Sequence, residues 1–77
     1  MSKIQTYLDN NLSPYNTVLL FSDLIKSGEI DKLSDHFISM KKIMILNGIL
    51  DKNGEILDED YMKDLAEFGE NYNGLLQ

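Results

Sequence analysis

The 77-residue sequence contains no cysteine and no arginine, and only one residue each of proline, alanine and histidine. Without cysteine no disulfide can support a small core, and the absence fits a reducing compartment, so we expect a cytoplasmic protein. The missing arginine and scarce alanine, together with frequent Lys, Asn, Ile and Tyr, are typical of an AT-rich coding sequence. This composition points to a low-GC bacterium, or to a phage or plasmid from one.

Long hydrophobic runs are also absent. The longest uninterrupted apolar runs are VLLF at 18–21 and IMIL at 43–46, whereas a membrane helix requires about 20 apolar residues. The N-terminal segment lacks the apolar stretch of a secretory signal. We therefore expect neither a signal peptide nor contact with a membrane. With 77 residues, of which 43% are hydrophobic, the chain has enough apolar material for one domain spanning 1–77.

Positive charge is scarce in the last third of the chain. Residues 1–50 hold five acids and five lysines, so their charges cancel. Residues 51–77 hold eight acids and two lysines, which gives −6, the net charge of the whole sequence. The acidic excess is therefore confined to the C-terminal segment.

Capping residues predict the first helices. Ser13 followed by Pro14 is typical of a helix start and Gly28 of a helix stop, which predicts a helix over 14–27. Its expected buried residues are Val18, Phe21, Leu24 and Ile25. The helical spacing of Ile4, Tyr7 and Leu8 favours a short helix over 3–9 as well.

Residues 30–47 allow two interpretations. Ile30, Leu33, Phe37, Met40 and Met44 recur at helical spacing, which is compatible with one helix ended by Asn47-Gly48. Alternatively the helix breaks between 36 and 39, and Ser39 caps a second helix. The second interpretation gives a helix-turn-helix, and the sequence does not decide between the two.

An Asn53-Gly54 pair lies between two short runs that suit β-strands, and it predicts a β-hairpin. A two-residue turn would pair Leu50 with Leu57. A three-residue loop with Gly54 in the bulge position would pair Leu50 with Ile56. Either hairpin is too short to be stable without support from helices.

The last helix has the clearest pattern. Asp58 is a suitable N-cap, and Glu59 and Asp60 suit the positive end of the helix dipole. The expected apolar stripe consists of Tyr61, Leu65, Phe68 and Tyr72, flanked by Met62 and Gly69. The opposite face carries acids, and these are the predicted partner-binding residues: Glu59, Asp60, Asp64, Glu67 and Glu70.

The segment ILDKNGEILDED resembles part of a calcium loop, but its register fails. Counting from Asp51, Ile56 stands where a calcium loop needs glycine, and Met62 stands where it needs an acid.

His36 is the only histidine and has no cysteine to accompany it, so zinc has too few ligands. Ser34, Asp35 and His36 are consecutive, and a helix would point them in different directions. We expect no metal, no cofactor and no enzymatic activity.

Helix, helix-turn-helix, hairpin and helix is the element order of a winged-helix domain. In that arrangement a helix capped by Ser39 would direct Lys41 and Lys42 toward DNA, and Lys52 would lie at the wing tip. The net charge of −6 and the absence of arginine make nucleic-acid binding the weaker hypothesis.

The sequence thus predicts a mainly α protein, a compact bundle of three to four helices with one small β-hairpin, with a winged-helix-like arrangement as one variant. The expected function is that of a small acidic protein-interaction module. Its acidic C-terminal helix would bind a partner with a basic surface, such as a nucleic-acid-handling protein. In size and charge the chain is similar to phage inhibitors of nucleases, including anti-CRISPR proteins. The alternative is a winged-helix transcriptional regulator. The oligomeric state stays open, with a homodimer as one option.

Overall fold

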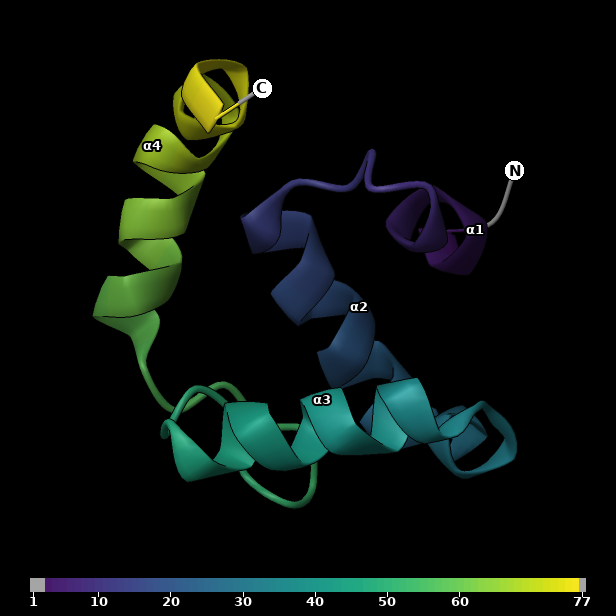
Figure 1. The fold of residues 1–77 in the computed structure, drawn as a ribbon. Helices are drawn as coiled ribbons and strands as arrows, with labels where there is room; N and C mark the ends of the chain where they lie inside the picture. Colours follow the sequence, from purple (N-terminus) through teal and green to yellow (C-terminus); the bar gives the residue numbers. More distant parts are fainter. Residues whose placement is uncertain (1–2, 77) are drawn as a thin grey trace.

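The computed structural model describes the backbone of residues 3–76 and the side chains of residues 3–67. Within that part of the chain, turns join four α-helices and one short 3₁₀ helix (Figure 1). They are α1 (Lys3–Leu8), α2 (Pro14–Ser27), η1 (Glu29–Lys32), α3 (Asp35–Leu46) and α4 (Glu59–Leu76). The predicted mainly helical bundle is confirmed.

Helix α2 is the central element. Figure 1 shows α1 and α4 on opposite sides of α2, with α3 crossing its C-terminal end. Because α2 has neighbours on several sides, it buries more than a single stripe: Val18, Leu20, Phe21, Ser22 and Leu24 are all buried. The predicted buried set omitted Leu20 and Ser22, and its member Ile25 packs against the core but is only partly buried.

The predicted ends of α2 are confirmed, and both are determined by local chemistry. The Asn16 backbone N–H donates to Ser13 Oγ at 3.2 Å, and Pro14 occupies the first helical position. At the other end Gly28 adopts a left-handed conformation with φ of 80°, and its N–H donates to the Ile25 carbonyl.

Residues 30–47 form neither of the two predicted arrangements. The helix does break, but the break lies at Leu33 and Ser34 rather than between 36 and 39. Ser34 is extended (φ −68°, ψ 167°), and Asp35 begins α3, where its negative charge suits the helix dipole. Ser39 lies inside α3 and caps nothing. The helix-turn-helix that would have carried a recognition helix is absent from the described residues.

The predicted β-hairpin is also not found, since the described residues contain no β-strand. A single antiparallel bridge joins Leu50 to Ile56, the pair expected for the three-residue loop. The chain on both sides is already engaged: the N–H groups of Ile49 and Leu50 donate to the Met44 carbonyl at the end of α3. On the other side, Asp58 already caps α4. Too few residues are left for the ladder to continue.

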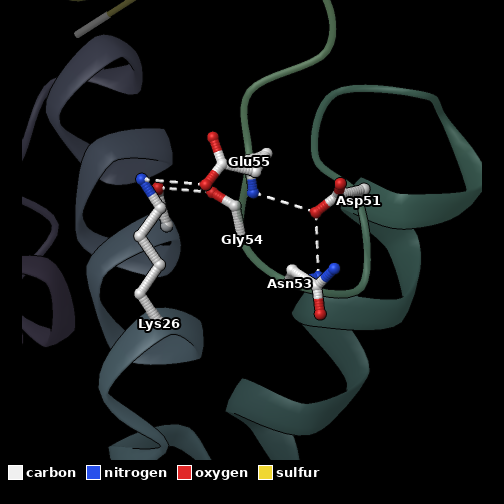
Figure 2. Close-up of polar contacts among 6 residues, drawn as sticks. Lys26, Asp51, Asn53, Gly54 and Glu55 are labelled. Carbon is white, nitrogen blue, oxygen red and sulfur yellow. Dashed lines mark hydrogen bonds and ion pairs between the residues drawn. The ribbon is translucent and has the colours of Figure 1, made fainter.

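The turn over residues 51–55 is held against α2. The hydroxyl of Ser22 donates to the Gly54 carbonyl at 2.6 Å, and this bond is buried. Lys26 approaches Glu55 to 3.8 Å, an exposed ion pair of little energetic value (Figure 2). Gly54 itself is buried, with φ of 88°. Since this turn leads directly into α4, its contact with α2 positions the last helix.

Helix α1 is attached through Tyr7. The Tyr7 ring packs edge-on against Phe21 with 5.4 Å between centroids, and it lies 5.6 Å from Phe37. A hydrogen bond of 2.6 Å joins its hydroxyl to Nε2 of His36, which lies exposed in the first turn of α3. One aromatic side chain thus connects three helices.

We predict that this attachment weakens in alkaline solution. Burial raises the pKa of the Tyr7 phenol above its ordinary value of 10.0, because desolvation disfavours the phenolate. The contribution to stability is therefore complete below pH 10 and is lost as the pH rises through the folded-state pKa. Urea midpoints at pH 8 and pH 11 should fall more for the wild type than for Tyr7→Phe. An equal fall in the two proteins would contradict this account.

Candidate protein-interaction surface

Helix α4 begins at a well-formed cap. Asp58 Oδ1 accepts a hydrogen bond from the Tyr61 N–H at 2.9 Å, and the Asp58 carbonyl accepts one from the Met62 N–H at 3.1 Å. Glu59 and Asp60 occupy the first turn, where carboxylates are favoured by the helix dipole. The predicted N-cap is confirmed, and it explains why acids gather at this end of the helix.

The buried side of α4 differs from the predicted stripe. Met62 is the buried residue, Leu65 is partly buried, and Tyr61 remains 38% exposed. The stripe was expected to include Tyr61 and Leu65, with Met62 only flanking it. The contact with α2 instead favours the flexible Met62 side chain, and the polar end of Tyr61 stays near water. The predicted stripe members Phe68 and Tyr72 lie outside the described side chains.

Four of the five predicted partner-binding acids are described, and all four are exposed: Glu59, Asp60, Asp64 and Glu67. We call these four residues the acidic face. Among the described side chains the only ion pair joins Lys26 and Glu55, so no lysine forms a close ion pair with the acidic face. None of the four carboxylates is held by a described hydrogen bond. The side chain of Glu70, the fifth predicted residue, is outside the described set.

The acidic face lies mainly opposite the buried side of α4. At 100° per residue, Asp60, Asp64 and Glu67 point away from Met62, whereas Glu59 lies nearer the core. Lys63 is exposed and is the only cation of the helix. Three carboxylates within two turns outnumber this one cation, and their excess negative charge can attract a basic surface.

A cleft of about 440 Å³ adjoins the N-terminal end of α4. We call it the apolar cleft, because many of its lining side chains are apolar: Leu12, Pro14, Val18, Met40, Ile43, Met44 and Ile49. Tyr61 lines it from α4, and the remaining lining residues are polar but uncharged: Tyr7, Asn10, Thr17 and Asn47. Ile43 is 47% exposed there, so the cleft presents hydrophobic surface to solvent.

The described residues lack the Ser39-capped recognition helix and the wing that were predicted to carry the three lysines of the DNA-binding hypothesis. Lys41 and Lys42 lie in the middle of α3, where Lys41 is partly buried and Lys42 exposed. Lys52 is exposed in the turn over 51–55, which forms no strands and hence no wing. The winged-helix-like variant of the fold is therefore unsupported.

The turn that resembles a calcium loop uses its oxygens internally. Asp51 Oδ1 accepts hydrogen bonds from the N–H groups of Asn53 at 2.8 Å and Glu55 at 2.9 Å (Figure 2). The Glu55 carboxylate is directed toward Lys26. Across the described residues there is no group of three or more His, Cys, Asp or Glu side chains that could hold a metal ion.

We predict that calcium leaves the stability unchanged. Asp51 Oδ1 already accepts two backbone hydrogen bonds, and a calcium site needs six to eight oxygens, whereas the described residues bring no three acidic side chains together. Thermal unfolding curves in EDTA and in millimolar calcium should coincide. A midpoint raised by many degrees in calcium would show that the turn rearranges into a binding loop.

Sequence reasoning did not identify the apolar cleft. Its lining residues come from α1, the loop after it, α2, α3, the segment after α3, and α4. No local pattern marks such a set. The only available signal was the run of apolar residues over 43–46, which exceeds what one helix face can bury: Ile43 is 47% and Leu46 85% exposed.

Comparison with known proteins gives one family match. A family model described as a domain of unknown function, DUF7417, matches residues 2–67, which cover α1 to the first half of α4 and include the acidic face. Neither the curated proteins nor the solved structures contain a match to the chain. Among the described residues, no helix is both long and apolar enough to span a membrane. Because the family model matches residues 2–67, which is most of the chain, the chain belongs to the DUF7417 family.

Proposed function

We propose that this protein is a small, non-enzymatic interaction module that binds a basic surface of a nucleic-acid-handling protein through the acidic face of α4. The composition supports an origin in a phage or another mobile element of a low-GC bacterium, and the cytoplasm as the site of action. In this proposal the carboxylates occupy a surface that would otherwise contact phosphates, so the protein acts as an inhibitor of its partner.

One observation carries the proposal: the carboxylates of the acidic face are exposed and unpaired, while the net charge of −6 arises from residues 51–77 alone. Charges that only maintain solubility are usually interspersed with the opposite sign. Here three of them share one helix surface, and complementary charge of this kind speeds association and selects partners.

DNA binding is the weaker candidate. Its predicted recognition helix and wing are missing from the described residues, and Lys41 is partly buried. A duplex-binding assay at low salt tests this directly, because a regulator that contacts phosphates binds most tightly there and loses affinity as salt rises. We expect no binding to duplex DNA under these conditions.

The proposed function is tested by capture from a low-GC bacterial lysate, with proteins identified by mass spectrometry. The bait is the wild-type chain, and the matched control is the variant in which Asp60, Asp64 and Glu67 are changed to Lys. A basic nucleic-acid-handling protein retained by the wild type and lost from the variant supports the proposal. Retention of the same proteins by both baits, or binding of the wild type to DNA alone, contradicts it.

A further inference from the structure

The apolar cleft is an open depression large enough to receive an apolar side chain. Its volume of about 440 Å³ falls within the range of about 300 to 1,000 Å³ that is usual for ligand sites. Its apolar residues include Met40 and Met44, whose unbranched side chains can adapt to different occupants. Exposed Ile43 and Tyr61 form its rim, so apolar groups can enter from solvent.

Charge around the cleft indicates the kind of occupant. No lining residue carries a formal charge. Tyr61 brings the cleft next to the acidic face, because Asp64 follows it by three positions and lies on the same side of α4. Lys41 and Lys42 lie on α3 but do not line the cleft. A segment seated in the cleft would therefore meet negative charge along α4.

The same charges argue against a second copy of this chain as the occupant. Each copy carries −6, all of it from residues 51–77. A second copy seated in the cleft would bring a net charge of −6 beside the acidic face, and like charges across an interface are unfavourable. A basic segment gains from the same arrangement.

We propose that the apolar cleft receives a bulky apolar side chain from a lysine- or arginine-rich segment of the partner, while the acidic face binds the flanking cations. This inference rests on the proposed function, and it adds the chemistry of the partner segment. The cleft supplies affinity through burial of apolar surface, and the acidic face supplies rapid association.

The test uses a lysine-rich peptide with one central tryptophan. Because this chain contains tyrosine but no tryptophan, emission excited at wavelengths that tyrosine does not absorb reports only the peptide. Binding should shift the emission to shorter wavelength.

Ile43→Ser should weaken binding about tenfold, since it removes apolar surface from the cleft rim. Leu46→Ser is the matched control, because Leu46 is 85% exposed on the same helix and does not line the cleft. It should leave the affinity within about twofold of the wild type. Tyr61→Ser provides a second cleft variant.

Three outcomes would overturn the inference. The first is that the wild type does not bind the peptide, or that Ile43→Ser and Tyr61→Ser bind as well as Leu46→Ser. The second is that a glutamate-rich peptide with the same tryptophan binds equally well. The third is a wild-type dimer in sedimentation that Ile43→Ser dissociates.

The proposed function fails in a different way. If the acidic face has no role, Lys variants of Asp60, Asp64 and Glu67 will bind the partner like the wild type, while Ile43→Ser still weakens peptide binding. If only the cleft account fails, the acidic-face variants will not bind the partner, whereas Ile43→Ser will bind the partner like the wild type. The two failures are therefore distinguishable.

Discussion

Gly54→Ala is expected to unfold the domain or to leave it close to unfolding at room temperature. A Cβ atom at this position would lie 2.8 Å from the Ser22 carbonyl oxygen and 3.0 Å from the Lys26 side chain. The backbone also has φ of 88°, which costs a non-glycine residue about 1 to 2 kcal/mol. Forcing the turn away from α2 adds about 1 to 3 kcal/mol of overpacking. Loss of the buried Ser22–Gly54 hydrogen bond adds a further cost of about 1 to 3 kcal/mol.

These penalties are large for a chain of this length. At about 0.05 to 0.15 kcal/mol per residue, a domain of 77 residues has a free energy of unfolding of only about 4 to 12 kcal/mol. The urea midpoint should therefore fall by a large fraction or disappear. Gly28→Ala is the matched control, because Gly28 has a similar φ of 80° but a Cβ atom added there would meet nothing within 4 Å. It should cost only about 1 to 2 kcal/mol. Equal effects of the two substitutions would show that the turn does not pack on α2 as described.

Changing Asp60, Asp64 and Glu67 to Lys is expected to abolish partner binding without unfolding the protein. All three side chains are exposed and point away from buried Met62, so the core is untouched. A basic partner would then face three cations, and like charges across an interface cost several kcal/mol, which corresponds to a loss of about 100-fold or more. The affinity for the captured partner measures the effect, and circular dichroism confirms the fold.

The matched control reverses the same amount of charge elsewhere. Asp23, Glu29 and Asp31 are exposed on α2 and η1, and changing them to Lys also raises the net charge from −6 to 0. If the location of the charge matters, this control should retain most of the wild-type affinity. If both triple variants lose binding equally, only the net charge matters and the acidic face has no special role.

The helix ends could be predicted because their causes are local. Ser13 and Asp58 each accept a hydrogen bond from the N–H three residues later, a contact that depends only on neighbouring sequence. The sequence allowed for a break in the helix over 30–47, but it did not indicate the residues at which the break occurs. Residues 34–39 contain two serines that could cap a helix, and Ser34 takes the N-cap position without a side-chain hydrogen bond, so no local capping contact distinguishes it from Ser39.

The absence of the β-hairpin could not be predicted from Asn53-Gly54, although Gly54 does take the expected positive φ. The Met44 carbonyl accepts the N–H groups of Ile49 and Leu50, and a contact with the end of α3 thereby competes with a strand ladder. Burial was predictable only in part for a similar reason. Leu20 is buried and Tyr61 is exposed because of where α1, α3 and α4 lie around α2. A helical wheel describes one helix alone and does not show these neighbours.

The most direct test of the acidic face is the salt dependence of the association rate between the wild-type protein and its captured partner. Raising the ionic strength from 0.1 M to 1 M shortens the Debye length from about 10 Å to about 3 Å, which removes attraction between separated charges. The association rate of the wild type should therefore fall steeply with salt, while that of the Asp60, Asp64 and Glu67 to Lys variant should not fall. A wild-type rate that is independent of salt, or a variant that associates as fast as the wild type at 0.1 M, would contradict the proposed role of α4.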